Sequence, residues 1–148
     1  MSKKTLEIYT DGACKGNPGP GGWAAILIWD GKIKEVSGFE TMTTNNRMEL
    51  MAAIEGLKQV KKPVKINLHT DSQYLKRGMP EWINLWLHNN WNKGKVKNRD
   101  LWEELINLDK QFAIEWHWVK AHNGDEHNER ADRLASKAIE QYIDYVEK

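Results

Sequence analysis

The chain has 148 residues, of which 40% are hydrophobic, so it is long and apolar enough to form one folded domain with a buried core. This excludes disordered and fibrous proteins. Its 22 Lys and Arg against 21 Asp and Glu leave a formal net charge of +1, so binding to a polyanion must depend on local patches. A single cysteine, Cys14, excludes an intrachain disulfide and a cysteine-built metal site and is typical of a reducing compartment. No apolar run approaches the ~18 residues of a spanning helix, so we expect a cytoplasmic protein without a membrane segment.

The first part of the chain predicts three antiparallel strands. The first strand alternates apolar and polar residues and is expected to end at Asp11-Gly12, where a dense turn segment over Gly16–Gly22 begins soon after. Asp30-Gly31 is a strong hairpin signal between the second strand and a more polar third strand. The expected strands are Leu6–Thr10, Trp23–Trp29 and Lys32–Phe39.

From Thr44 onward the apolar period becomes helical. Leu50, Ile54 and Leu57 predict a helix of about four turns that Thr44 or Asn45 caps and that Pro63 closes. The remaining elements alternate between strands and helices. They are a strand over Val64–His69, a short helix capped by Thr70-Asp71-Ser72, a helix that begins near Glu81 after Gly78 and Pro80, a polar loop between Trp91 and Asp100, a helix with Leu101, Leu105 and Leu108, a strand over Ile114–Trp118, and a final helix over Ala131–Tyr142. This order predicts an α/β fold with one mixed five-stranded sheet and helices packed on it.

Four acidic residues are candidates for one metal site. Asp11 and Asp71 each follow an apolar strand, although each is also suited to capping a turn or a helix. Glu49 shares a helical stripe with small residues that permit close approach to a sheet, and a solvated glutamate is the alternative. Asp132 lies near the start of the last helix, where a negative charge is favourable in any case. If they converge, an all-oxygen site selects Mg²⁺ or Mn²⁺ over zinc, and two cations suit phosphoryl displacement.

His122 and a tryptophan-rich basic segment are further candidates. His122 lies beside a glycine in a loop ten positions before Asp132, where it is able to move protons or assist product departure, or is an ordinary loop histidine. Trp82, Leu85 and Trp86 lie at helical spacing, and Trp91 precedes four cations, a combination that suits nucleic acid. Packing of one helix on its neighbour and a solvated loop are the alternatives. This segment contains Trp82, Trp86 and Trp91, followed by Lys93, Lys95, Lys97 and Arg99.

These motifs together closely resemble the type 1 ribonuclease H family of bacteria. The matching stretches are Tyr9–Cys14 with Gly16–Gly22, Thr44–Leu50, Thr70–Tyr74, and the segment from Trp118 through His122 to Asp132. They cover nearly the whole chain in family order, and each of the four acids lies inside its own motif. The resemblance implies a ribonuclease H-like fold over residues 1–148 and a single catalytic domain.

The resemblance also implies an activity and a set of site residues. The expected reaction is endonucleolytic cleavage of the RNA strand of an RNA–DNA hybrid, leaving 3′-hydroxyl and 5′-phosphate ends, by a protein expected to be a monomer. Two Mg²⁺ ions, which Mn²⁺ is able to replace, would be held by Asp11, Glu49, Asp71 and Asp132, with His122 assisting. Contacts to RNA 2′-hydroxyls are expected at Cys14, Gly16, Asn17, Asn45, Asn46 and Gln73. The DNA strand is expected on Tyr74, Trp82 and Trp86, with Thr44 and Asn98 near a DNA phosphate.

The chain departs from many bacterial relatives in having no fixed positive charge over Leu87–Asn92 and in having Met42 where some relatives have arginine. We therefore expect weaker capture of substrate with catalysis retained. Two other functions stay open at this point. One is a metal-dependent DNA nuclease of the resolvase or integrase kind, and the other is a hybrid-binding module whose catalytic site is weak.

Overall fold

The computed structural model describes residues 5–94, 96–119 and 126–147. Five strands form one sheet in the order β3-β2-β1-β4-β5. The first three strands pair antiparallel, and β4 and β5 continue the sheet parallel to β1. The mixed five-stranded α/β sheet that the sequence predicts is therefore confirmed. The strands are β1 (Thr5–Cys14), β2 (Gly19–Trp29), β3 (Lys32–Thr43), β4 (Lys65–Thr70) and β5 (Ala113–Trp118).

The first two strands are longer than the sequence predicts. β1 does not end at Asp11-Gly12 but continues to Cys14, and β2 begins at Gly19, inside the segment expected to be a loop. Gly12 pairs with Trp23, and the register continues until Cys14 pairs with Gly21. Pairing with a neighbouring strand thus overrides the turn preference of the glycines. The expected hairpin is confirmed, because Asp30 and Gly31 both have positive φ angles, of 50° and 78°.

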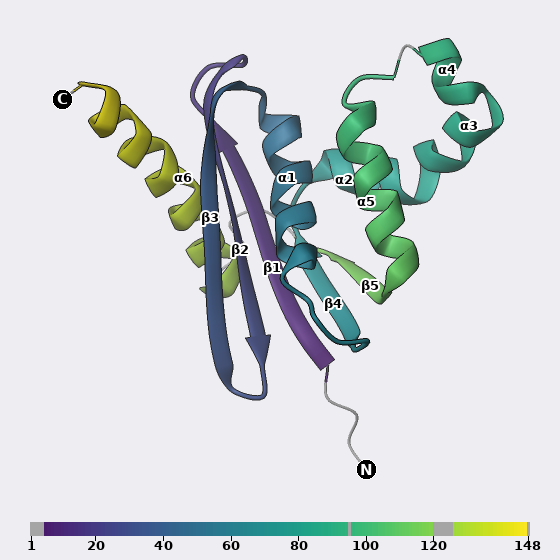
Figure 1. Ribbon diagram of the computed structural model, residues 1–148, viewed down its shortest axis with the longest axis horizontal. Helices are drawn as coiled ribbons and strands as arrows, with labels where there is room; N and C mark the ends of the chain where they lie inside the picture. The colour runs from purple at the N-terminus through teal and green to yellow at the C-terminus, as the bar shows by residue number, and fades with distance from the viewer. Residues whose placement is uncertain (1–4, 95, 120–125, 148) are drawn as a thin grey trace.

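The helices lie on both sides of the sheet. In Figure 1, α1 (Asn45–Lys58) lies on one side and α6 (Glu126–Glu147) on the other, and α6 contacts β1, β2 and β3. Thr44, one of the two predicted caps, is the residue that caps α1. Its hydroxyl oxygen accepts a hydrogen bond of 3.2 Å from the Arg47 amide. The core lies between the sheet, α1 and α5 (Arg99–Gln111). Its fully buried members include Ile8, Leu50, Ile54, Leu57, Ile66, Leu68, Trp102 and Leu105.

The segment between β4 and α5 is more helical than predicted. A helix that was expected to begin near Glu81 instead runs on from α2 (Gln73–Arg77) through the π-helical turn η1 (Gly78–Trp82) into α3 (Ile83–His88). The wider turn accommodates Pro80, which has no amide hydrogen to donate. A further helix, α4 (Asn90–Gly94), occupies part of the predicted polar loop. Figure 1 shows α3 and α4 away from the sheet, beyond α5.

Within the residues that the structure describes, none of the helices has both the length and the apolar character needed to cross a lipid bilayer.

Candidate active site

Two adjacent parallel strands place Asp11 and Asp71 at the same level of the sheet. The register of β1 and β4 pairs Tyr9 with His69, and each aspartate lies two residues further along its own strand direction. Side chains two residues apart on a strand point to the same face of the sheet. The carboxylates of Asp11 and Asp71 therefore lie on the face that carries Tyr9 and His69. Asp11 lies within β1, whereas Asp71 comes directly after the last residue of β4, Thr70. The strand-end position predicted for Asp71 is therefore found, and that of Asp11 is not.

Glu49 reaches the same place because α1 packs tightly on β1 at Gly12. A Cβ atom at Gly12 would lie 2.5 Å from the backbone nitrogen of Glu49 and 2.5 Å from the carbonyl carbon of Met48, so only glycine fits. The Gly12 amide donates a hydrogen bond of 3.0 Å to Glu49 Oε1 and also one of 2.9 Å to Asp11 Oδ1. One backbone amide therefore holds two of the candidate carboxylates beside each other.

Three of the four predicted acids form one cluster, and the fourth, Asp132, lies next to Asp11. Carboxylate oxygens of Asp11, Glu49 and Asp71 all lie within 4.8 Å of one another. Asp132, on α6, lies close enough to Asp11 for a hydrogen bond between the two side chains, one of several causes that raise the pKa of Asp11. Glu49 is only 5% exposed, so it is not the solvated glutamate considered above, and Asp11 lies inside β1, 8% exposed, where it caps neither a turn nor a helix.

The electrostatics of this cluster favour a cation. Burial raises the pKa of Asp11 well above its usual range, and the negative charges of Glu49 and Asp71 raise it further. Burial likewise raises the pKa of Glu49, with Asp71 adding to the shift, while hydrogen bonds with Asp11 and Gly12 oppose it. Without a cation, these carboxylates therefore resist being ionised together.

The residues present fit a hard divalent metal ion. Glu49 Oε2 is buried, and no donor among the described residues meets it. A buried acceptor without a partner costs free energy that a bound cation would recover. The donors are all carboxylate oxygens, which suit Mg²⁺ or Mn²⁺ and not the softer metals that thiolates bind. The cluster is thus suited to hold a metal ion between β1, the end of β4 and α1.

Polar groups that were expected to meet RNA lie along the start of α1 and the turn between β1 and β2. Asn17 Oδ1 accepts a hydrogen bond of 3.2 Å from the Asn45 amide, which ties the turn to the helix. Asn45 and Asn46 are exposed in the first turn of α1. Gly16 has a φ angle of 75° in the same turn. The Cys14 thiol lies 3.5 Å from the carbonyl oxygens of Gly19 and Thr43, and burial raises its pKa.

Three of the residues expected to meet DNA pack against one another just after Gln73. Gln73, which was expected to meet an RNA 2′-hydroxyl, is exposed at the start of α2, directly after the helix cap Ser72. Tyr74 packs edge-on against Trp82, with ring centroids 5.7 Å apart, and Trp82 packs against Trp86 at 5.8 Å. Both tryptophans are half-buried and also pack on the core. Each of these two tryptophans is therefore anchored in the core and also partly open to solvent.

Trp91 and the basic residues after it only partly match the predicted platform. Trp91 is 7% exposed and stacks on Trp86, so it belongs to the core. The guanidinium of Arg99 lies 5.1 Å from the centre of the Trp91 ring and also pairs with Glu103 at 2.6 Å. Lys97 is exposed. Lys95 and the Lys93 side chain lie outside what the structure describes.

Asn98 and Tyr74 belong to a hydrogen-bond network that the sequence did not reveal. The Tyr74 hydroxyl accepts hydrogen bonds of 3.1 Å from Asn98 Nδ2 and 2.9 Å from Trp102 Nε1. Arg47 donates to Asn98 Oδ1 at 3.2 Å and forms a two-pronged ion pair with Asp100 at 2.9 and 3.1 Å. Arg47 lies in α1, two residues before Glu49. This network therefore joins the helix that carries Glu49 to Tyr74 and the tryptophans packed on it. The pairing of Arg47 with Asp100 has no local sequence signal.

We predict that Tyr74→Phe lowers the free energy of unfolding by about 1.5 kcal/mol, because the indole N–H of fully buried Trp102 loses its acceptor. Thermal denaturation followed by circular dichroism should show a Tm lower by roughly 3–6 °C. Tyr142→Phe is the matched control, since Tyr142 is half-buried on α6 and packs on Phe39. An unchanged Tm for Tyr74→Phe would show that this hydroxyl contributes nothing to stability.

A second group without a sequence signal lies behind the carboxylates. The rings of Tyr9, His69 and His117 stack across β1, β4 and β5, with centroids 4.3 and 4.8 Å apart. His69 Nε2 lies 2.9 Å from Glu7 Oε1. His127, at the start of α6, packs on Tyr9 with a centroid separation of 4.8 Å. His69, His117 and His127 thus pack together with Tyr9 on the sheet face that carries Asp11 and Asp71.

His122, the remaining predicted catalytic residue, lies in residues 120–125, outside the described part of the chain. Its role stays a prediction.

Comparisons with known proteins identify the family of this chain. The RNase H family model matches residues 3–140. The chain is 58% identical to the ribonuclease H of Wolbachia sp. subsp. Drosophila simulans (strain wRi) over 142 residues, which cover 94% of this chain and 98% of that protein. It is 55% identical to the ribonuclease H of Caldanaerobacter subterraneus subsp. tengcongensis, with 96% and 95% covered.

Solved structures show the same fold. The crystal structure of LC9-RNase H1, a type 1 RNase H with the type 2 active-site motif, superposes with a TM-score of 0.83 at 31% identity, over 95% of this chain and 74% of that one. LC11-RNase H1, solved in complex with an RNA/DNA hybrid, has a TM-score of 0.69 at 24% identity, over 93% and 99% of the two chains. With its carboxylate cluster on the neighbouring inner strands β1 and β4 and on α1, the chain belongs to the ribonuclease H family of hydrolytic nucleases.

Proposed function

We propose that this protein cleaves the RNA strand of RNA–DNA hybrids endonucleolytically, with two Mg²⁺ ions as cofactors, and leaves 3′-hydroxyl and 5′-phosphate ends. The observation that carries the proposal is the set of carboxylate oxygens of buried Asp11, buried Glu49 and half-buried Asp71, all within 4.8 Å of one another, with Asp132 next to Asp11. Family membership supports hydrolysis of hybrids as the reaction.

The four carboxylates would hold the metal ions, and the Gly12 amide would keep Asp11 and Glu49 in place. When bound, the ions supply activation of the attacking water and stabilisation of the departing 3′ oxygen. Asp71 is less buried than Asp11 and Glu49, so the cluster would be reached by a metal ion and its substrate from the side of Asp71. His122 would accept or donate a proton as the product leaves.

Choice of the RNA strand would come from the amide groups next to the cluster. The side chains of Asn45, Asn46 and Gln73 are able both to donate and to accept hydrogen bonds, as a 2′-hydroxyl requires. The exposed positions of these three residues at the starts of α1 and α2 support this role. The DNA strand would lie on Tyr74, Trp82 and Trp86, whose aromatic faces tolerate any sequence.

A cleavage assay on matched substrates tests the proposal. We expect cleavage of the RNA strand of a hybrid when Mg²⁺ is present and none in excess chelator. Duplex DNA and duplex RNA of the same sequence should remain intact. Cleavage of duplex DNA at a comparable rate would favour a resolvase-like enzyme instead, and binding of the hybrid without turnover would favour a binding module.

We predict that His122→Ala lowers kcat by about a hundredfold, because a positioned proton carrier contributes this much to hydrolysis. KM should change less than kcat, since the imidazole acts after the substrate has bound. Steady-state kinetics over a range of hybrid concentrations measures both constants. His88→Ala, at the exposed end of α3, is the matched control. A change confined to KM would show that His122 binds substrate.

A further inference from the structure

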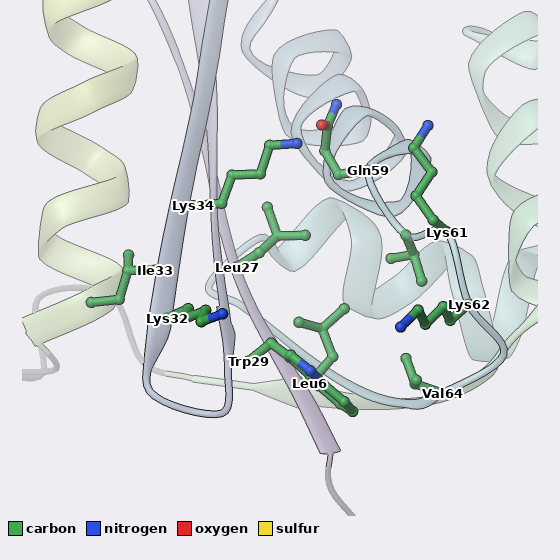
Figure 2. Close-up of a pocket in the computed structure, with 11 residues that line it drawn as sticks. Leu6, Leu27, Trp29, Lys32, Ile33, Lys34, Gln59, Lys61, Lys62 and Val64 are labelled. Carbon is green, nitrogen blue, oxygen red and sulfur yellow. The ribbon is translucent and has the colours of Figure 1, made fainter.

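Arg47 lies at the start of α1 and contacts both residues that are expected near a DNA phosphate. Its backbone amide donates to the Thr44 hydroxyl at 3.2 Å, and its guanidinium donates to Asn98 Oδ1 at 3.2 Å. The apolar pocket in Figure 2 lies beyond the other end of the same helix, where Gln59 and Val60 line it. Arg47 therefore belongs to the active-site end of α1 and has no part in that pocket.

Asn98 has an unusual backbone and an unusual side-chain role for a residue at the start of a helix. It is the N-cap of α5, with a φ of 61° and a ψ of 27°, in a left-handed region that asparagine adopts more readily than most residues but still at a cost. Asparagine is also a favoured capping residue, yet this side chain makes no capping hydrogen bond to α5. The side chain is turned instead toward Arg47 and Tyr74. Strain of this kind persists only where surrounding contacts hold it, and it is concentrated at functional sites.

The contacts of the Asn98 amide fix which of its two polar atoms faces which neighbour. A guanidinium has no acceptor, so Arg47 must meet the amide oxygen. The amide nitrogen donates one hydrogen to the Tyr74 hydroxyl at 3.1 Å, which leaves its second hydrogen for another acceptor. The same hydroxyl accepts from Trp102 Nε1 at 2.9 Å, so its own hydrogen is directed away from both donors. Among the described residues neither hydrogen has an acceptor, and together they suit a ligand that only accepts hydrogen bonds, such as a phosphate oxygen.

The ion pair between Arg47 and Asp100 holds the guanidinium in this position. Arg47 Nη1 and Nη2 donate to the two carboxylate oxygens of Asp100 at 3.1 and 2.9 Å, and this planar fork fixes both the place and the tilt of the guanidinium. The Asp100 side chain is 65% exposed, so water screens the pair and its contribution to stability is small. The main effect of the pair is therefore on orientation.

We propose that Arg47 and Asp100 are positioning residues for the DNA strand, because they fix the Asn98 amide with its nitrogen toward the bound phosphate backbone. This rests on the proposed function, in which the DNA strand lies on Tyr74 and the two tryptophans beside it. Asp100 orients Arg47, Arg47 holds the amide oxygen of Asn98, and the amide nitrogen donates to a phosphate oxygen. Holding a group in its bound orientation before the ligand arrives increases affinity. Without the fork the amide is free to turn its oxygen toward the phosphate, where two acceptors repel each other.

Arg47 itself is poorly placed to be the phosphate-binding cation. Both hydrogens of Nη1 are taken, one by Asn98 and one by Asp100, and Nη2 donates to Asp100 as well. The negative charge of Asp100 also opposes the attraction that a phosphate would feel toward Arg47. A phosphate met by neutral donors keeps its counterions, so this contact should add nothing to the salt dependence of hybrid binding.

Hybrid binding by two matched variants tests the proposal. Lys58 and Glu104 form a second ion pair between α1 and α5, at 2.7 Å, so Glu104→Ala removes the same charge from the same helix without touching Asn98. Anisotropy titration of a fluorescein-labelled RNA–DNA hybrid in excess chelator measures Kd. We expect Asp100→Ala to bind about fivefold more weakly than Glu104→Ala, which corresponds to the loss of about one hydrogen bond. KM should rise by a similar factor with kcat unchanged, because the metal-binding acids are untouched.

A second comparison shows whether Asp100 acts through Asn98. Glycine adopts the left-handed backbone of Asn98 without strain, so Asn98→Gly should fold as the wild type does, which circular dichroism checks, while its hybrid binding weakens about fivefold. Adding Asp100→Ala to Asn98→Gly should then weaken binding no further, whereas two independent effects would multiply.

The contrary results are distinct from a failure of the proposed function. Equal Kd values for Asp100→Ala and Glu104→Ala would overturn the proposal, as would effects that multiply in the double variant. Tighter binding by Asp100→Ala with a steeper salt dependence would also overturn it, since Asp100 would then mask Arg47 as a phosphate-binding cation. In all of these cases the wild type still cleaves the hybrid. If the proposed function fails, the wild type itself does not cleave it.

Discussion

Asp71→Asn is expected to lower kcat for Mg²⁺-dependent hybrid cleavage by about three orders of magnitude, because about 4 kcal/mol of transition-state stabilisation is lost with a metal-binding carboxylate. Asp71 lies within 4.8 Å of the oxygens of Asp11 and Glu49, and an amide has nearly the same shape but binds a divalent cation poorly. The affinity for hybrid in chelator should persist, since the amide-bearing and aromatic residues that would contact the two strands are untouched.

Steady-state kinetics on a labelled hybrid and anisotropy titration in chelator measure the two quantities separately. Asp109→Asn is the matched control, because Asp109 lies in α5 and accepts a hydrogen bond of 3.0 Å from Trp116, which an amide oxygen can also accept. Turnover by Asp71→Asn close to that of the wild type would remove this carboxylate from the reaction. Loss of hybrid affinity as large as the loss of kcat would instead make Asp71 a binding residue.

Convergence of the acids was predictable to the extent that it depends on periodicity. Strand periodicity places Asp11 and Asp71 on one face, and a crossover helix between their strands implies that the strands are parallel. The stripe of Ala52, Ala53 and Gly56 indicated correctly that the Glu49 helix approaches the sheet closely, and a Cβ at Gly56 would lie 3.0 Å from the Ala25 side chain. These patterns involve residues close together in the sequence, and such patterns predicted the structure correctly.

What the sequence did not reveal depends on contacts between distant segments. β1 continues past Gly12 because β2 pairs with it, and no property of residues 11–14 alone indicates that pairing. The helix through Gly78 and Pro80 likewise contradicts local preference. A Cβ at Gly78 would lie 2.0 Å from the ring of Trp102, so packing against α5 explains the glycine, which local reasoning interprets as a break.

Functional neighbours of the site were missed for the same reason. Arg47 and Asp100 are separated by 53 positions, and Tyr9, His69 and His117 become neighbours only once the strand order is known. Residue type and spacing identify the candidate metal-binding acids, because each lies in a sequence motif. The residues that hold those acids in place come from distant segments and are found only in the folded structure.

Asp11→Asn is expected to raise the free energy of unfolding of the metal-free protein by roughly 3 kcal/mol at alkaline pH, because active-site charges are held at a cost to stability. Burial, Glu49 and Asp71 raise the pKa of Asp11 far above the ~4 of an unfolded chain. Above about pH 4 the folded wild type thus binds more protons at this site than the unfolded chain does. Its stability must therefore fall as pH rises, until the raised pKa of Asp11 has been passed. The asparagine variant has no such proton and should lack this contribution to the fall.

Thermal denaturation in chelator across the pH range measures the difference. The Tm of the variant should exceed that of the wild type by roughly 6–12 °C at high pH and by little below about pH 4, where an aspartic acid and an asparagine are both neutral. Mg²⁺ should raise the Tm of the wild type more than that of the variant, since a ligand stabilises only the folded state that binds it. Asp109→Asn again serves as control. The contrary result would be a wild-type stability that rises from pH 4 to pH 9, with no gain for the variant. It would show that these carboxylates do not repel one another, and the physical reason for a metal at this site would be lost.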